Sequence, residues 1–255
     1  MGVIPRTIKL TLQYDGTDYV GWQRQAEGVS IQGLLEDALR PIEGAPVTVH
    51  GAGRTDAGVH AAGQVASVTL TATLDTSTLA RALNAVLPVD LRVVDVEEMP
   101  ADFHARFSAT GKIYQYRIVN AAFVSPFARR YVWHVIPKLD KDAMRRASHM
   151  LVGTHDFSAF RAIGTPVAST VRTIRRLEWR DEPDGLFVME VEGDGFLRHM
   201  VRSIAGTLVE IGWGRWPPEA MQDILDSRDR ARAGTTAPPQ GLFLMSVMYG
   251  QGSVA

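Results

Sequence analysis

The residues of this chain best suited to chemistry lie in one glycine-rich run, Gly51-Ala52-Gly53-Arg54-Thr55-Asp56-Ala57-Gly58-Val59-His60. Within it, Arg54 and Asp56 place a guanidinium and a carboxylate two residues apart. Glycines let the backbone bend sharply and let a ligand approach closely. Strands are expected on both sides, over residues 47–49 and 64–70, so that a rigid frame holds a permissive loop.

Asp56 is the candidate nucleophile or general base of this loop. A neighbouring arginine lowers the pKa of a carboxyl group by about 1 to 3 and keeps it charged, and Arg54 or another arginine would serve. The alternative is structural, because an Asp between glycines most often closes a turn by accepting hydrogen bonds from backbone amides.

Two other interpretations of the loop are weaker. A P-loop needs Gly-Lys-Ser/Thr, which is absent, and the glycine spacing does not fit the dinucleotide-binding fingerprint. A metal site would use His50, Asp56 and His60, but no second cluster of ligands supports it. We therefore do not expect a metal at this loop.

Tyr114 and Arg202 are further candidates. Tyr114 falls in a strand expected over residues 112–119, and an aromatic ring on a sheet can stack on a base, a contact worth about 1–3 kcal/mol. The alternative for Tyr114 is a core tyrosine. Arg202 belongs with Arg198 and His199 to a basic patch on an apolar helix expected over residues 196–211. Its place near the apolar stripe calls for a carboxylate partner, although a solvated helix face explains the patch equally well.

The composition is that of a globular protein. The chain has 255 residues, of which 45% are hydrophobic and 22% charged. It contains no cysteine, which excludes disulfides and a thiolate nucleophile and fits a reducing compartment. No apolar run approaches the roughly 18 residues of a membrane helix, and the first residues lack the apolar stretch of a secretory signal. We expect a cytoplasmic protein without a membrane partner.

The charge is unevenly distributed along the chain. Residues 1–100 carry 7 Lys and Arg against 12 Asp and Glu, whereas residues 101–255 carry 20 against 16. Arginines outnumber lysines by 23 to 4, which favours phosphate contacts and stacking on bases, although an arginine-rich proteome would give the same bias.

The periodicity predicts an α+β fold. Both halves mix strands with helices, and hairpin connections are common. Helices are expected to begin near Ser30, Thr78, Asp140 and Pro217, and Pro41 is expected to end the first of them. Strands are expected over residues 7–14, 91–96 and 242–248, and a hairpin over 171–180 and 186–192. Two subdomains sharing one sheet fit better than two independent domains.

Taken together and in order, these segments resemble the tRNA pseudouridine synthase A family over nearly the whole chain. The matching motifs are Tyr14-Asp15-Gly16, Gly21-Trp22-Gln23, Gly53-Arg54-Thr55-Asp56-Ala57-Gly58-Val59-His60, Asp102-Phe103-His104-Ala105-Arg106-Phe107-Ser108-Ala109, Lys112, Tyr114, Tyr116, His155-Asp156-Phe157, Met200-Val201-Arg202 and Gly241-Leu242-Phe243-Leu244.

This resemblance implies a fold and an activity. The fold would be that of the pseudouridine synthases, with two related α/β subdomains, residues 1–110 and 111–255, sharing a mostly antiparallel mixed sheet with helices packed on one side. The activity would be that of an isomerase converting uridine to pseudouridine in the anticodon arm of tRNA, as a homodimer without cofactor or metal and with no DNA partner.

The resemblance also implies residue roles. Asp56 would be the nucleophile, and Tyr114 would stack on the target uracil and could take part in proton transfer. Arg202, joined by Arg54, would pair with Asp56 and hold it charged. Candidates for the RNA-facing surface come from the basic second half of the chain: Arg129, Arg130, Arg172, Arg175 and Arg176. A non-catalytic RNA-binding protein on the same scaffold is the alternative, and a metal hydrolase is a more distant one.

Overall fold

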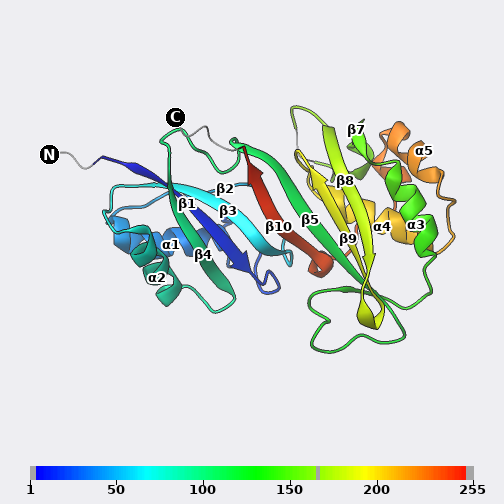
Figure 1. The fold of residues 1–255 in the computed structure, drawn as a ribbon, viewed down its shortest axis with the longest axis horizontal. Coiled ribbons are helices and arrows are strands. Elements are labelled where there is room, and N and C mark those ends of the chain that lie inside the picture. The colour runs from blue at the N-terminus through cyan, green and yellow to red at the C-terminus, as the bar shows by residue number, and fades with distance from the viewer. Residues whose placement is uncertain (1–3, 165–166, 251–255) are drawn as a thin grey trace. The chain divides into compact units, whose positions relative to one another are not determined.

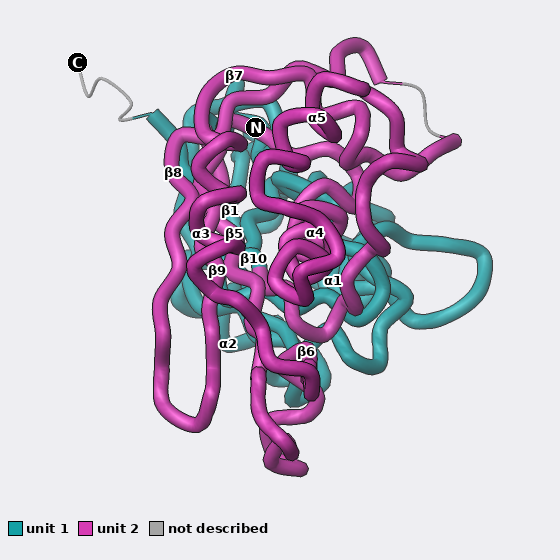
Figure 2. Tube along the Cα trace, turned by 90° about the vertical axis from the view of Figure 1, so that its right-hand side faces the viewer, with its two compact units in different colours: residues 1–110, 244–255 teal, residues 111–243 magenta. Residues whose placement is uncertain are grey.

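The computed structural model describes residues 4–164 and 167–250 and confirms the α+β fold (Figure 1). The chain divides into two compact units (Figure 2). Among the described residues, unit 1 comprises 4–110 and 244–250, and unit 2 comprises 111–243. The last strand thus returns to the first unit for most of its length.

Unit 1 is an antiparallel sheet with two helices. Its main strands follow the order β4 (Leu91–Met99), β1 (Arg6–Tyr14), β3 (His60–Leu70) and β10 (Leu242–Tyr249), and the short β2 (His50–Gly51) also pairs with β3. The helices are α1 (Ile31–Glu43) and α2 (Thr76–Val86). The strands expected over residues 91–96 and 242–248 are confirmed as β4 and β10.

The core of unit 1 follows from alternation along β1. Ile8, Leu10 and Leu12 are fully buried, while the residues between them are more exposed. One face of the sheet therefore carries the apolar side chains. The helices contribute a matching set of fully buried leucines, namely Leu35, Leu39, Leu79 and Leu83.

Unit 2 is built on the same plan. Its strands follow the order β5 (Ala109–Asn120), β9 (Leu186–Gly193), β8 (Val171–Asp181) and β7 (Gly153–Asp156), and β6 (Trp133–Val135) pairs in parallel with β5. Its helices are α3 (Lys141–His149), α4 (Met200–Gly212) and α5 (Ala220–Ser227). The expected hairpin is β8–β9, closed by a short 3₁₀ turn, Pro183–Gly185. No helix in the described part of the chain has the length and apolar character needed to span a bilayer.

The start of the first helix, capped by Ser30, is confirmed, but its end and the start of the second helix were predicted wrongly. Helix α1 does not end at Pro41 but continues to Glu43, where Gly44 adopts a left-handed conformation and its N–H donates to the Arg40 carbonyl at 2.9 Å. Helix α2 begins before Thr78, because the Asp75 carboxylate accepts a hydrogen bond from the Thr78 N–H and caps the helix. In both cases the true signal is a cap rather than the residue chosen.

The strand expected over residues 47–49 is absent. The Val49 N–H donates to the Glu36 carboxylate at 3.2 Å, and its carbonyl accepts from the Gln32 amide at 3.1 Å. Side chains of α1 thus bind the backbone groups that a neighbouring strand would otherwise bind, and pairing begins only at β2.

The helix expected over residues 196–211 begins later, at Met200. His199 has φ = 64°, in the left-handed region, so the preceding residues form a turn and not a helical face. Arg198 and His199 therefore do not share a helix with Arg202, and the predicted basic helix face does not form.

Helix α4 is the most deeply buried helix of unit 2, and Gly206 lies in its interior. A Cβ at Gly206 would lie 1.8 Å from the Thr235 carbonyl oxygen. We expect Gly206→Ala to lower the free energy of unfolding by about 2 kcal/mol or more, since overpacking outweighs the gain of about 1 kcal/mol in helix propensity. Urea unfolding measures the change.

The matched control is Gly44→Ala, whose new methyl group would meet nothing within 4 Å and whose cost is only that of the positive φ, about 1 kcal/mol. If Gly206→Ala were more stable than the wild type, close packing of α4 would not be what requires the glycine.

Candidate active site

The loop that carries Asp56 connects β2 to β3 and is anchored to a second loop. Asp56 forms an isolated antiparallel bridge with Gly21, and the Trp22 N–H donates to the Thr55 carbonyl at 3.0 Å. Gly21 has φ = 104°, and a Cβ there would lie 2.6 Å from the Thr55 carbonyl oxygen. Glycine is thus required at this position, because two backbone segments meet there.

Three buried polar side chains hold the loop from beneath. The Tyr14 hydroxyl lies 2.8 Å from the Thr55 hydroxyl, and the Gln64 amide donates to the Gly53 carbonyl at 2.9 Å and to the Tyr14 oxygen at 3.4 Å. Thr55 is buried, whereas its neighbour Asp56 is partly exposed and Arg54 is exposed. The loop therefore presents its carboxylate from a fixed base.

The other end of the loop packs against the turn after β1. The His60 Nδ1 atom lies 3.0 Å from the Gly16 nitrogen and 3.1 Å from an Asp15 carboxylate oxygen, and the ring is buried. A Cβ at Gly16 would lie 2.0 Å from the Val59 carbonyl oxygen. His60 thus fastens this turn to the loop. No group of three or more potential metal ligands occurs among the residues that the structure describes.

Trp22 has a packing role. Its side chain is buried, and a Cβ at Gly51 would lie 2.4 Å from the indole Cε2. The ring therefore lies flat against the backbone of β2, just before the Asp56 loop.

Tyr114 and Arg202 lie in unit 2, whereas Asp56 and Arg54 lie in unit 1. Tyr114 is on β5, opposite Val191 of β9, and is 8% exposed. Its ring meets Phe196 edge to face, with centroids 5.0 Å apart. Both interpretations of Tyr114, core packing and stacking on a base, remain compatible with this position.

Arg202, in the first turn of α4, is held by backbone on both sides. Its Nε donates to the Ala237 carbonyl at 2.8 Å, and the Ala237 N–H donates to the Arg202 carbonyl at 3.0 Å. Burial raises the pKa of Tyr116, and the charge of Arg202 partly offsets this effect. The guanidinium is therefore close to Tyr116 and has a defined orientation.

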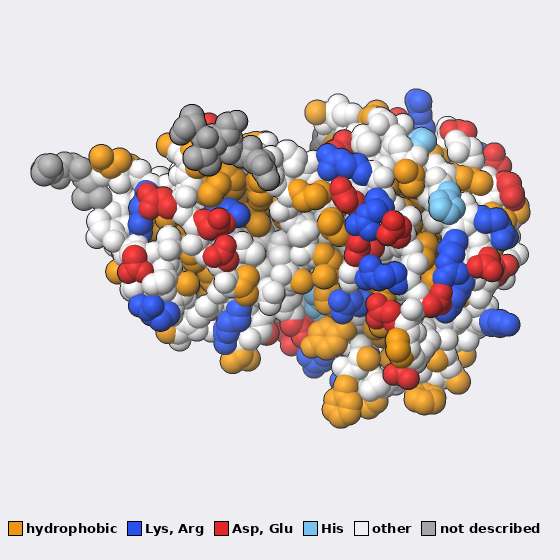
Figure 3. Space-filling model, in the orientation of Figure 1, with side chains coloured by type: hydrophobic (Ala, Val, Ile, Leu, Met, Phe, Trp, Pro, Cys, Tyr) orange, Lys and Arg blue, Asp and Glu red, His pale blue; other side chains and the backbone are white. Residues whose placement is uncertain are grey.

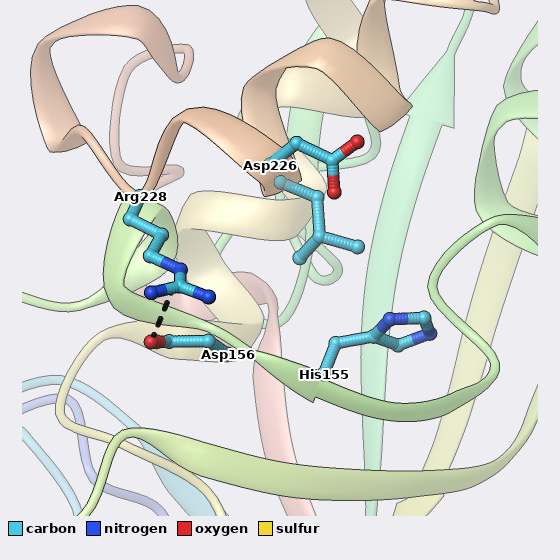
Figure 4. A pocket seen from close by; sticks show the side chains of 5 residues that line it. His155, Asp156, Asp226 and Arg228 are labelled. Carbon is cyan, nitrogen blue, oxygen red and sulfur yellow. Dashed lines mark ion pairs between the residues drawn. The ribbon is translucent and has the colours of Figure 1, made fainter.

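The motif around Asp156 is structural. His155 and Asp156 line a small hollow with Asp226 and Arg228 (Figure 4). Burial alone would raise the pKa of Asp156, but hydrogen bonds, chiefly with Ser158, and the charge of Arg228 lower it below its ordinary value. The Arg228 guanidinium lies 3.4 Å from the Asp156 carboxylate, so the two charges in this hollow partly balance each other.

The expected RNA-facing arginines on β8 are not equivalent. Arg176 forms ion pairs at 2.8 Å with Glu178 and with Glu190, and Arg180 lies 3.3 Å from Glu190. Acidic and basic side chains alternate over the exposed face of β8 and β9 (Figure 3). These charges are balanced within the protein, so Arg176 is a poor candidate for a phosphate contact.

Comparisons with known proteins identify the family. A family model described as tRNA pseudouridine synthase matches residues 11–108 and 147–250. The tRNA pseudouridine synthase A of Myxococcus xanthus is 48% identical over 252 residues, covering 99% of this chain and 95% of its own. That of Syntrophotalea carbinolica is 47% identical over 242 residues, covering 95% of this chain and 96% of its own.

This chain belongs to the tRNA pseudouridine synthase family, which confirms the resemblance inferred from its motifs. A solved chain described as part of a Cbf5-Nop10-Gar1 complex covers 80% of this chain and 44% of its own length, with 10% identity and a TM-score of 0.39, a likeness too weak to define the fold.

Tyr14 provides a test of the buried base of the loop. Burial raises its pKa to about 12, although hydrogen bonds with Thr55 and Gln64 partly offset this. In the unfolded chain the phenol titrates near pH 10. Above that pH the unfolded state has lost a proton that the folded state retains, so stability falls with rising pH up to about 12, by about 1.4 kcal/mol per pH unit for this group.

We expect Tyr14→Phe to remove this part of the alkaline loss of stability. At neutral pH the variant should be less stable by about 1 kcal/mol, because Thr55 loses its hydrogen-bond partner. Urea unfolding at a series of pH values measures both effects. An alkaline slope equal to that of the wild type would show that Tyr14 ionises as freely as an exposed tyrosine.

Proposed function

We propose that this chain isomerises uridine to pseudouridine in the anticodon arm of tRNA, with Asp56 as the nucleophile. The observation that carries the proposal is the firmly anchored loop that bears Asp56, in a chain that is similar over nearly its full length to relatives named tRNA pseudouridine synthase A. Asp56 is partly exposed, whereas its neighbour Thr55 is buried.

The chemistry suits a single carboxylate. The reaction breaks the bond between ribose and the base nitrogen, turns the uracil and rejoins it to the ribose through carbon, so substrate and product contain the same atoms. Asp56 would begin the reaction by attack on the sugar, by attack on the base, or by promoting loss of a ribose proton. Each route needs an ionised carboxylate close to the nucleotide.

The target uridine has to leave its stack before a carboxylate can reach it, at a cost of a few kcal/mol. Contacts with the displaced base and with the phosphates have to offset this cost. We assign Tyr114 to stacking on the uracil, and Arg202 and Arg54 to keeping the Asp56 carboxylate charged. We also assign the active form as a homodimer, which is tested by measuring the mass of the purified protein in solution. We assign it to the cytoplasm, which is tested by fractionation of cells.

Asp56→Asn tests the nucleophile. The amide keeps the size of the side chain but removes the charge, so pseudouridine formation on unmodified tRNA should fall by about three orders of magnitude or more. Binding of tRNA should be retained, because Thr55 and the base of the loop are unchanged. Nuclease digestion followed by chromatography measures the product, and filter binding measures the affinity.

Product formation by Asp56→Asn at the wild-type rate would overturn the assignment of Asp56. If the wild type binds tRNA but forms no pseudouridine, and Asp56→Asn binds tRNA equally well, the non-catalytic RNA-binding alternative is supported instead.

Tyr114→Phe separates stacking from proton transfer. The phenyl ring keeps the edge contact with Phe196, so tRNA affinity should change less than about twofold. If the phenol transfers a proton, the rate constant of the chemical step should fall by about 10²- to 10⁴-fold. Single-turnover kinetics measure this rate constant. A value equal to that of the wild type would leave Tyr114 a stacking role only.

A further inference from the structure

A column of aromatic rings stands beside the Asp56 loop in unit 1. The rings of His50 and His104 have centroids 4.9 Å apart with an angle of 34° between planes, and those of His104 and Phe107 are 4.4 Å apart at 38°. The Arg106 guanidinium lies 5.7 Å from the centroid of the Phe107 ring. Four π-systems that can stack thus follow one another.

The outer end of this column is open to solvent. Phe107 is 77% exposed, and His50 and Arg106 are also exposed. An exposed phenyl ring gains nothing from the hydrophobic core, and such a ring beside a guanidinium is typical of surfaces that stack on nucleic-acid bases.

The column is rigid because its backbone is fastened at several points. The Ala105 N–H donates to the Ser67 hydroxyl at 3.0 Å, and the Ala105 carbonyl accepts from the Tyr249 hydroxyl at 2.7 Å. Ser67 is also the register partner of His50 on β3. The His104 Nδ1 accepts from the Arg106 N–H at 3.1 Å, which fixes the orientation of the imidazole ring.

The same anchor connects the column to the Asp56 loop. The side chain of Ala105 is fully buried in a small cluster with Ala52 and Val65, and the Ala52 N–H donates to the Val65 carbonyl at 2.7 Å. Ala52 is the second residue of the glycine-rich run. The rings and the catalytic loop are therefore parts of one packed structure within unit 1.

The local charge favours RNA over a second protein surface. The two segments that carry the column, residues 44–55 and 103–110, contain Arg54 and Arg106 and no Asp or Glu. Two copies of such a surface would repel each other across a twofold axis, whereas a phosphate backbone would be attracted. The pKa of His104 is lowered by burial and by the neighbouring His50 and Arg106, which favours a neutral ring suited to stacking.

We propose that His50, His104 and Phe107, with the guanidinium of Arg106, form a stacking platform for an unstacked base of the RNA substrate. The proposal rests on the proposed function, which supplies the RNA. The platform would hold a base displaced from its stack, next to the loop that presents Asp56, and so recover part of the free energy spent on extruding the target uridine.

Substitutions of Phe107 test the platform with matched side chains. Phe107→Leu keeps an apolar residue but removes the flat ring, and affinity for unmodified tRNA should fall about 5- to 150-fold. The slope of log affinity against log salt should be unchanged, because no charge is lost. Phe107→Tyr should stay within about twofold of the wild type, since the ring remains.

Arg106→Ala should behave differently. It removes one cation, so the magnitude of the salt slope should fall by about 0.7 to 0.9. Fluorescence anisotropy with labelled tRNA over a range of salt concentrations measures all the variants. Because Phe107 is exposed, thermal unfolding of Phe107→Leu should match that of the wild type, and circular dichroism checks this.

The outcomes distinguish the two proposals. If the wild type forms pseudouridine and Phe107→Leu binds tRNA as tightly as Phe107→Tyr, the platform is overturned and the proposed function stands. If Phe107→Leu keeps its affinity but changes the mass of the protein in solution, the ring belongs to a contact between copies of this chain, which also overturns the RNA assignment. A wild type that binds no tRNA overturns both proposals.

Discussion

The buried hydrogen-bond set beneath the glycine-rich loop is the constraint on which the rest of the site depends. The Tyr14 hydroxyl and the Gln64 amide are buried where their partners are the Thr55 hydroxyl and the Gly53 carbonyl. A buried polar group without a partner costs about 1–3 kcal/mol, so the loop lies where it satisfies these groups. The position of Asp56 is fixed in turn, because Thr55, the residue before it, cannot move without breaking these hydrogen bonds.

Close backbone contact adds a second constraint from residues distant in sequence. Gly16 and Gly21 approach the carbonyl groups of Val59 and Thr55 so closely that a side chain at either position would collide with backbone. The segment between these two glycines therefore encloses the loop on both sides of Asp56. A run that looks flexible in sequence is thus fixed, and its glycines serve close approach more than mobility.

Much of the fold could be predicted because alternation and helix caps are local signals in the sequence. The predictions failed where contacts between residues distant in sequence decide the local structure. The strand of β1 follows from alternating residues, whereas residues 47–49 look like a strand but bind the side chains of Gln32 and Glu36 instead. The left-handed conformation of His199 has no local signal and shortened the helix before Arg202. Gly44, not the proline, ends α1.

The site shows the same division between local and distant contacts. Asp56 and Arg54 could be singled out because they are neighbours in sequence, but the residues that fix the loop could not. Tyr14 and Gln64 are separated from each other by 50 positions, and only the pairing of β1 with β3 brings them together. The one signal available was that Tyr14 ends an alternating strand on its apolar face, which predicts burial but not a partner.

The number of arginines in a part of the chain and the surroundings of each arginine point to different surfaces for RNA. Arg176 and Arg180 belong to the basic half of the chain, yet glutamates on the same sheet face balance them. Arg106 lies instead in a segment of unit 1, residues 103–110, that has no acidic residue. A phosphate interacts more strongly with a cation that has no carboxylate beside it. A local absence of acidic residues is therefore a better guide to an RNA-facing surface than net charge, and in unit 1 it leads to the exposed ring of Phe107.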